Sequence, residues 1–327
     1  MWLWFQFGVG AKMPPHIDAL IREVQTEPLP EQMPGEKGSV ENEGVRIVYE
    51  VINKGGPAGT VLLVQGLSST MLEWPPWFYG ALAEAGFEVI RYDNRGVGES
   101  DWMVERWAQG EKYTLEDMAT DGLAILDHLG VEKAHIVGVS MGGMISQRIA
   151  ISYPERVLSL TSIMSSGYFY DKTLPNVPPL FYLGFVKALM LYGRDLTKDE
   201  NKLKLHLSIQ EILKGKGGYE LNHKAILQKS LYEITRRKGY NATARTQHGY
   251  AIKKSGSRYA ELGSIKAPTL VVHGTDDPLV AFEHALKYAP MIPGAQTLFL
   301  EGMGHDLPQA YADRVLEGLL RHLKAAA

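Results

Sequence analysis

The feature that most constrains this chain is the pentapeptide Gly138-Val139-Ser140-Met141-Gly142, a serine with a glycine two residues away on either side. It follows an apolar run, 135–139, typical of a buried strand, and precedes a run, 141–150, with the apolar and small residues of a helix packed on a sheet. At a sharp turn from strand to helix, a side chain at either glycine would clash with its surroundings. The pattern predicts a strand that delivers Ser140 as a nucleophile. The alternative is a glycine-rich turn that only tightens the packing of helix on strand.

Strand-like and helical patterns alternate over most of the chain. The strand-like runs are 45–51, 60–64, 88–92, 135–139, 157–164, 269–273 and 296–300. Most are separated by helical patterns, which predicts an α/β fold with a mostly parallel sheet and right-handed crossovers. The alternation stops between about residues 168 and 262, where the chain has the pattern of helices and turns.

This pattern divides the chain into four parts. Residues 1–37 contain an apolar segment, a short helix and a proline-rich linker. We expect the core to comprise residues 38–167 and 263–327, with a helical insertion at 168–262 between its two parts.

Composition narrows the class of protein. The chain has 327 residues and no cysteine, which excludes disulfides, thiolate nucleophiles and thiolate metal ligands. Its hydrophobic content of 45% and net charge of -3 are typical of a soluble globular protein and give no reason to expect nucleic-acid binding. We expect a cytoplasmic location and no transmembrane span.

Charge is unevenly distributed despite the small total. Residues 201–260 carry 13 Lys or Arg against three acids, a net charge of +10. That charge could dock the insertion on the acidic remainder or steer an anionic substrate, and the alternative is ordinary solvated helix faces.

The first residues, 1–11, are strongly apolar but lack the basic start of a signal peptide and the length of a membrane span. They are either an anchor for a surface or a homo-oligomer, or a segment that packs on the protein itself or frays.

A nucleophilic serine needs a base to take its proton and an acid to orient that base. Both candidates lie downstream, at the ends of consecutive predicted strands. Asp276 and Asp277 follow the run 269–273, and His305 follows the run 296–300 in a loop after two glycines. Because parallel-sheet sites form at the carboxyl ends of strands, these side chains are expected near Ser140.

The order Ser140, Asp277, His305 resembles that of the α/β-hydrolase superfamily. The stretch Asp93-Asn94-Arg95-Gly96-Val97-Gly98-Glu99-Ser100 is similar to the family's D-x-R-G-x-G-x-S turn, to which we assign no catalytic role. The resemblance covers about residues 38–323 and is greatest to the esterase group that contains aclacinomycin methylesterase. It implies an eight-stranded, mostly parallel sheet with helices on both faces and a helical cap inserted after the sixth strand. The family pattern G-x-x-D selects Asp277 over Asp276.

Acyl transfer also needs donors for the negative charge that develops on the carbonyl oxygen. The backbone N–H of Met141, directly after the nucleophile, is expected to be one donor. The family implies that the second comes from the loop after the third strand, which is the N–H of Leu67 here. That loop departs from the family pattern, because Gln65 stands where a histidine is usual.

Aromatic residues near the oxyanion loop and in the insertion are candidates to line an apolar substrate pocket, although such clusters also build cores. The candidates are Trp74, Trp77, Tyr168 and Phe181. The interpretation that follows is a serine carboxylesterase acting on small to medium esters, with no metal or cofactor required. The alternatives are a cofactor-free perhydrolase or a C–C bond hydrolase on the same triad, and a ligand-sensing homologue with little turnover.

Overall fold

The computed structural model describes residues 13–326 and contains one eight-stranded sheet with the order β1-β2-β4-β3-β5-β6-β7-β8. The hairpin of β1 and β2 is antiparallel and β2 is antiparallel to β4, whereas all pairs from β4 to β8 are parallel. The strands are β1 (Glu36–Asn42), β2 (Val45–Pro57), β3 (Thr60–Val64), β4 (Phe87–Tyr92), β5 (Ala134–Val139), β6 (Val157–Ile163), β7 (Thr269–Gly274) and β8 (Gln296–Leu300). The predicted mostly parallel, eight-stranded α/β-hydrolase sheet is therefore confirmed.

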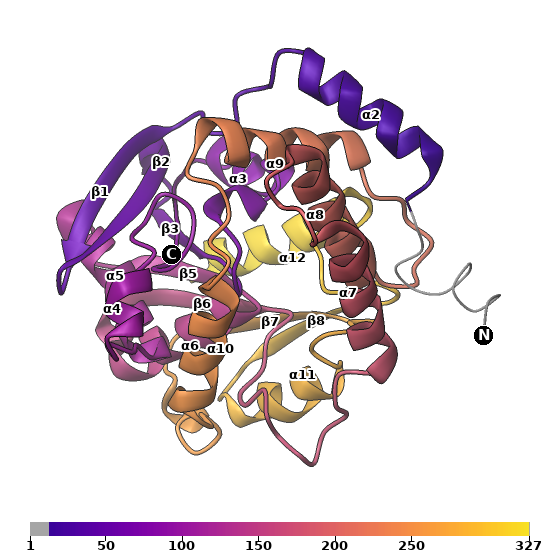
Figure 1. The fold of residues 1–327 in the computed structure, drawn as a ribbon. Coiled ribbons are helices and arrows are strands. Elements are labelled where there is room, and N and C mark those ends of the chain that lie inside the picture. The colour runs from indigo at the N-terminus through magenta and orange to yellow at the C-terminus, as the bar shows by residue number, and fades with distance from the viewer. Residues whose placement is uncertain (1–12, 327) are drawn as a thin grey trace.

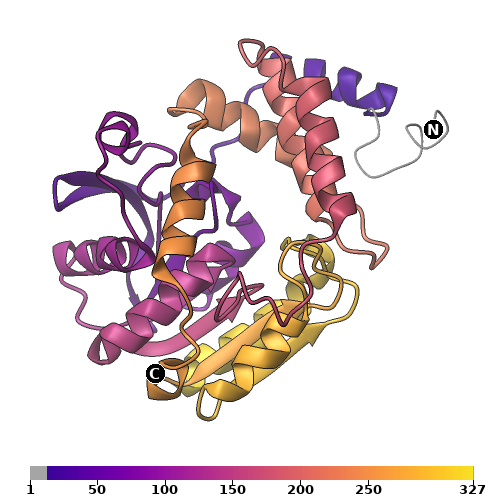
Figure 2. The same cartoon turned by 60° about the horizontal axis from the view of Figure 1, so that its bottom comes forward.

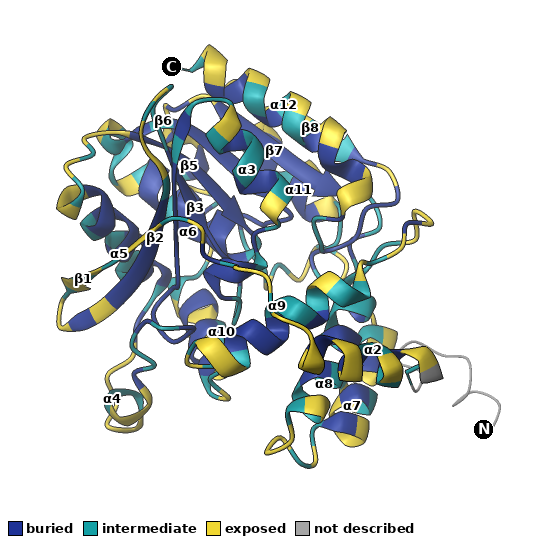
Figure 3. Cartoon of the chain, turned by 90° about the horizontal axis from the view of Figure 1, so that it is seen from above, coloured by how far each residue is buried: buried dark blue, intermediate teal, exposed yellow. Residues whose placement is uncertain are grey.

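Helices cover both faces of the sheet, as the alternation of side chains along each strand requires. In β3, Val61 and Leu63 pack with α3 (Pro76–Glu84) and α12 (Ala312–Ala325), whereas Leu62 and Val64 pack on the other face. The helices of that second face are α5 (Leu115–His128), α6 (Met141–Ser152) and α11 (Glu283–Tyr288). Figure 3 shows the central strands as the buried interior, with the exposed sides of these helices facing outward. A short helix, α4 (Val104–Ala108), follows the turn after β4.

The helical insertion lies between β6 and β7, as predicted. Its helices are α7 (Pro179–Tyr192), α8 (Asp199–Leu213), α9 (His223–Arg236) and α10 (Ala244–Ser255). Figures 1 and 2 show α7 to α9 grouped together and α10 closer to the sheet. Helix α10 reaches the core through Ala251 and Ile252, which belong to the same hydrophobic cluster as α5 and α6.

The N-terminal helix α2 (Pro15–Thr26) packs on the insertion rather than on the sheet (Figure 1). Ile17, Ile21 and Val24 are buried against Leu203 of α8 and Leu227 of α9, among others. The first strand begins at Glu36, slightly before the boundary expected at residue 38. The domain boundaries at residues 38, 168 and 263 stay predictions.

Helix α7 exposes an unusual amount of apolar surface. The exposed apolar side chains on it are Leu180, Tyr182, Leu183, Val186, Leu189, Met190 and Leu191. The backbone N–H of Met13 donates a hydrogen bond of 2.9 Å to Tyr192 Oη at the end of this helix.

The segment 1–12, for which we expected an anchoring or self-packing role, lies outside the described residues. Within residues 13–326, no helix combines the length and the apolarity needed to cross a membrane.

Candidate active site

Ser140 sits at a sharp turn between β5 and α6. Its backbone angles are φ 56° and ψ -120°, a conformation that non-glycine residues rarely adopt. A Cβ added at Gly138 would lie 2.2 Å from the carbonyl oxygen of Gly142, and one at Gly142 would lie 2.0 Å from the carbonyl oxygen of Val64. Both positions therefore require glycine, which is the steric reason expected from the pentapeptide.

The three predicted triad residues lie together at the carboxyl edge of the sheet. His305 Nε2 is 3.0 Å from Ser140 Oγ, and His305 Nδ1 is 2.7 Å from Asp277 Oδ2. Ser140 is partly accessible, whereas Asp277 and His305 are buried. This is the geometry in which an imidazole can accept the serine proton while a carboxylate orients it.

Asp277 rather than Asp276 faces the histidine. Its Oδ1 accepts the backbone N–H groups of Leu279 at 2.9 Å and Val280 at 2.8 Å, which leaves Oδ2 for His305. Burial would raise the pKa of Asp277, but the charge of His305 and a hydrogen bond from the neighbouring His273 hold that pKa well below its usual range. The carboxylate is therefore ionised at neutral pH.

The loop that carries His305 is held by the insertion. The backbone N–H of His305 donates to the carbonyl of Leu213, the last residue of α8, at 2.8 Å. The segment after α8 and the loop with His305 approach each other closely. A Cβ at Gly215 would lie 2.2 Å from the carbonyl oxygen of Gly302, and one at Gly304 would lie 2.2 Å from the nitrogen of Gly215. The position of His305 thus depends on the helical insertion.

A tyrosine and a second aspartate complete this contact. Tyr219 Oη donates to Asp306 Oδ1 at 2.7 Å and accepts the N–H of Gly215 at 2.8 Å. Burial raises the pKa of Asp306 to about 6. Its Oδ2 is buried without a hydrogen-bond partner among the described residues.

The two expected oxyanion donors flank Ser140. Within residues 13–326, neither the N–H of Leu67 nor that of Met141 donates a hydrogen bond to another protein group. The Leu67 loop passes close to Ser140, since a Cβ at Gly66 would be 3.2 Å from Ser140 Cβ. Gln65 is held on both sides, because its Oε1 accepts the N–H of Gly66 at 2.8 Å and its carbonyl accepts Asn94 Nδ2 at 2.9 Å.

The turn after β4 is a polar framework beside this loop. Asp93 Oδ1 accepts the N–H of Met71 at 2.8 Å, and Asp93 Oδ2 pairs with Arg237 of the insertion. Arg95 makes a bidentate pair with Asp121, at 2.6 Å for each contact. These contacts fit the expected role of this turn, which is to shape the chain next to the site.

The four aromatic candidates for a substrate pocket lie in different surroundings. Trp74 is completely buried and Trp77 is half-buried, and both pack against the core cluster that includes Phe78. The structure therefore places Trp74 in the hydrophobic core. Tyr168 is in ring contact with other tyrosines, and Phe181 lies on α7. Pocket roles for Trp74, Trp77, Tyr168 and Phe181 stay predictions.

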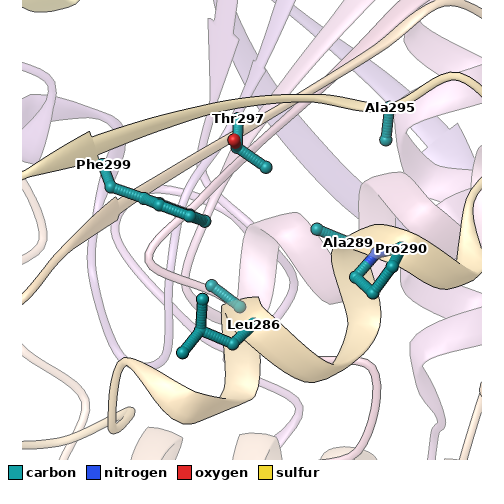
Figure 4. A pocket seen from close by; sticks show the side chains of 7 residues that line it. Leu286, Ala289, Pro290, Ala295, Thr297 and Phe299 are labelled. Carbon is teal, nitrogen blue, oxygen red and sulfur yellow. The ribbon is translucent and has the colours of Figure 1, made fainter.

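A separate apolar depression of about 210 Å³ lies between α11 and the edge strand β8 (Figure 4). Leu286 and Pro290 border it on one side, and Thr297 and Phe299 of β8 border it on the other. None of its lining residues belongs to the triad.

Among the described residues, no group of three or more acidic, histidine or cysteine side chains is arranged to bind a metal ion.

Comparison with known proteins agrees with this fold. The family described as alpha/beta hydrolase fold matches residues 59–308, and the chain belongs to this family. Rhodomycin D methylesterase DauP of Streptomyces sp. (strain C5) is 32% identical over 289 residues, covering 83% of this chain and 93% of that protein. Rhodomycin D methylesterase DnrP of Streptomyces peucetius is 30% identical over 293 residues, with the same coverage of 83% and 93%.

Solved structures of low identity share the fold. A mutant of the meta-cleavage product hydrolase CumD from Pseudomonas fluorescens IP01, complexed with acetates, superposes with a TM-score of 0.69 at 21% identity, covering 89% of this chain and 98% of that one. The expected resemblance to α/β hydrolases and to methylesterases is confirmed.

Sequence reasoning missed the residues that support the site from the insertion. These residues are Leu213, Tyr219 and His248, whose Nδ1 accepts the backbone N–H of Ser68 at 3.0 Å, and they lie in helices or loops whose patterns show only amphipathic packing. Tyr219 alone had a local signal, since it follows the glycine-rich segment 215–218. The positions of the others depend on how the insertion folds back on the core.

Proposed function

We propose that the chain is a serine carboxylesterase that hydrolyses small to medium carboxylic esters through an acyl-enzyme on Ser140. The observation that carries this proposal is the hydrogen-bonded series Ser140, His305 and Asp277, with the serine in a strained turn. The two methylesterase relatives at 32% and 30% identity support an ester with a small alcohol group.

The geometry leads to a two-step reaction. His305 Nε2 takes the proton of Ser140 Oγ, whose oxygen attacks the ester carbonyl. The same imidazole then protonates the leaving alcohol, and a water molecule repeats the sequence on the acyl-enzyme to release the acid. Asp277 accepts the Nδ1–H of His305 throughout and stabilises the imidazolium. The scheme calls for no metal or cofactor.

The tetrahedral intermediate carries its negative charge on the former carbonyl oxygen. We assign the N–H groups of Met141 and Leu67 as its donors, because both are unpaired within residues 13–326 and lie on the two segments that border Ser140. Met141 is the first residue of α6, so the positive end of that helix dipole adds to the stabilisation.

A C–C bond hydrolase is the second candidate. A 2-hydroxy-6-oxononadienedioate/2-hydroxy-6-oxononatrienedioate hydrolase of Paraburkholderia phymatum is 28% identical over 288 residues, covering 85% of this chain and 91% of that protein. The same triad could serve that reaction, so the substrate decides between the two.

The test combines a serine-directed fluorophosphonate label with two substrate panels. We expect the wild-type chain to take one label at Ser140 and to hydrolyse short p-nitrophenyl esters. Ser140→Ala should lose both properties while keeping the wild-type circular dichroism spectrum. Full activity of Ser140→Ala would refute the assignment, and turnover of a dienone without turnover of esters would favour the C–C bond hydrolase.

A further inference from the structure

The oxyanion loop contains a tight turn that is unfavourable for its sequence. The N–H of Ser69 donates to the carbonyl of Gly66 at 3.3 Å, which closes a turn with Leu67 and Ser68 at its centre. Ser68 has a φ of 59°, whereas Leu67 is not among the residues with positive φ. One positive φ at the third position defines a type II turn, in which glycine is the usual residue at that position. A serine there is unfavourable, so contacts from neighbouring groups help to hold the turn.

The group that contacts Ser68 is a histidine from the insertion. His248 lies on α10, is completely buried, and accepts the backbone N–H of Ser68 at Nδ1 over 3.0 Å. Its other nitrogen, Nε2, is 2.8 Å from the carbonyl oxygen of Arg95 in the turn after β4. The side chain therefore bridges the oxyanion loop and that turn.

These two contacts fix the protonation of the imidazole. Because Nδ1 accepts an N–H, the single ring proton must be on Nε2, which donates it to the backbone carbonyl oxygen of Arg95. Burial lowers the pKa of His248 to about 4, so the ring is neutral at neutral pH. The phenol ring of Tyr113 packs on its edge at a centroid distance of 6.3 Å, which restricts rotation of the ring.

We propose that His248 is a positioning residue for the oxyanion hole, and that it keeps the peptide between Leu67 and Ser68 in the orientation of the type II turn. This inference rests on the proposed function. A flip of that peptide converts a type II turn into a type I turn and relieves the positive φ of Ser68. The flip would break the bond from Ser68 to His248, so the histidine opposes it.

The orientation of this turn matters because of what its neighbouring peptide carries. The carbonyl of Gly66 and the N–H of Leu67 belong to one peptide group, and the bond from Ser69 to Gly66 sets its direction. When the turn relaxes, that bond weakens and the Leu67 N–H no longer points steadily at the oxyanion. Since charge on the oxygen is greatest in the transition state, the loss should appear in kcat rather than in KM.

Two variants of His248 separate its two hydrogen bonds. The side-chain oxygen of asparagine reaches the position of Nδ1 and can accept from Ser68, but asparagine cannot reach Arg95. The side-chain amide of glutamine reaches the position of Nε2 and can donate to Arg95, but glutamine presents no acceptor to Ser68. Each variant loses one bond, so the pair is matched for general damage to the buried site.

We expect His248→Gln to lower kcat for a p-nitrophenyl ester by about 10-fold to 100-fold, below the roughly 100-fold to 1000-fold cost of removing an oxyanion donor outright. His248→Asn should stay within about 3-fold of the wild type, because it keeps the bond to the loop. KM should change by less than about 3-fold in both variants. Thermal unfolding of each variant checks that the chain is folded.

A rescue variant tests the turn itself. Ser68→Gly supplies the residue that a type II turn prefers, so in the His248→Gln background it should restore kcat by about 3-fold or more. Equal losses in the glutamine and asparagine variants, a loss only in the asparagine variant, no loss in either, or failure of the rescue would each refute the positioning role. A wild-type chain that takes no fluorophosphonate label and hydrolyses no ester would refute the proposed function, and the positioning role with it.

Discussion

Replacing Asp277 by asparagine tests how the site orients its base. The carboxylate has two separate tasks in the structure, because Oδ1 accepts the N–H groups of Leu279 and Val280 while Oδ2 accepts the proton on His305 Nδ1. The oxygen of asparagine can still accept the two backbone N–H groups, so the loop should keep its shape. The new amide group, however, presents a hydrogen to His305 Nδ1 in place of a lone pair.

The consequence is a reversed tautomer. With Nδ1 as acceptor, the ring proton of His305 moves to Nε2, which then cannot take the proton of Ser140. The equivalent change in a serine protease lowers kcat on the order of 10⁴-fold, which is about 5 kcal/mol of transition-state stabilisation. We expect a similar loss of kcat for Asp277→Asn in a p-nitrophenyl ester assay at neutral pH.

The adjacent aspartate provides a matched control. Asp276 is partly exposed, and its contact with this region is made by its backbone N–H, which donates to the carbonyl of Met303 at 3.1 Å. Asp276→Asn should therefore keep kcat within about 3-fold of the wild type. An Asp277→Asn variant with more than about a tenth of wild-type kcat, or an equal loss in the two variants, would contradict the assignment of the acid.

Two further variants test the packing around the site. Gly138→Ala places a methyl group 2.2 Å from a carbonyl oxygen of α6. We therefore expect urea titrations to show a free energy of unfolding that is lower by about 1–3 kcal/mol, and we expect esterase activity to be lost. Wild-type stability of this variant would contradict the steric reasoning. Tyr219→Phe removes the hydroxyl that donates a hydrogen bond to Asp306, so it should lower the free energy of unfolding by about 1–3 kcal/mol. Burial raises the pKa of Asp306 in the folded chain to about 6, so the unfolded chain releases this proton at a lower pH than the folded chain does. The free energy of unfolding therefore falls as the pH rises from the ordinary pKa of an aspartate to about 6. Losing the tyrosine bond raises that pKa further, so denaturant titrations should show a larger loss at about pH 8 than at about pH 4, and a loss independent of pH would refute this reasoning.

The sequence was most informative where local rules determine structure. Runs such as 60–64 and 135–139 are almost wholly apolar because both faces of a central parallel strand are covered. Strand β1 was harder to place, since Glu36–Asn42 is an edge strand with no fully buried residue and therefore no apolar run. Its partner β2 gave the clearer signal because most of its residues from Val45 to Val51 are buried.

The same distinction applies to the site. Ser140 and His305 stand beside glycines that a sharp turn and a close approach require, so their settings are visible in the sequence. The contact from Ser68 to His248 joins residues 180 positions apart, and nothing near His248 indicates which loop it will meet. The aromatic candidates show a related limit, because an aromatic residue near a site, such as the buried Trp74, has the same local pattern whether it lines a pocket or fills the core.

The bond from His305 to the end of α8 has a consequence for protein engineering. Exchanging insertions between related hydrolases is attractive as a way to change substrate range, because the sheet supplies all three triad residues. In this chain a donor insertion would also have to supply a backbone carbonyl at the position of Leu213 and a glycine at the position of Gly215. A chimera that preserved the core but omitted these two features would leave His305, the proposed base, without a fixed position.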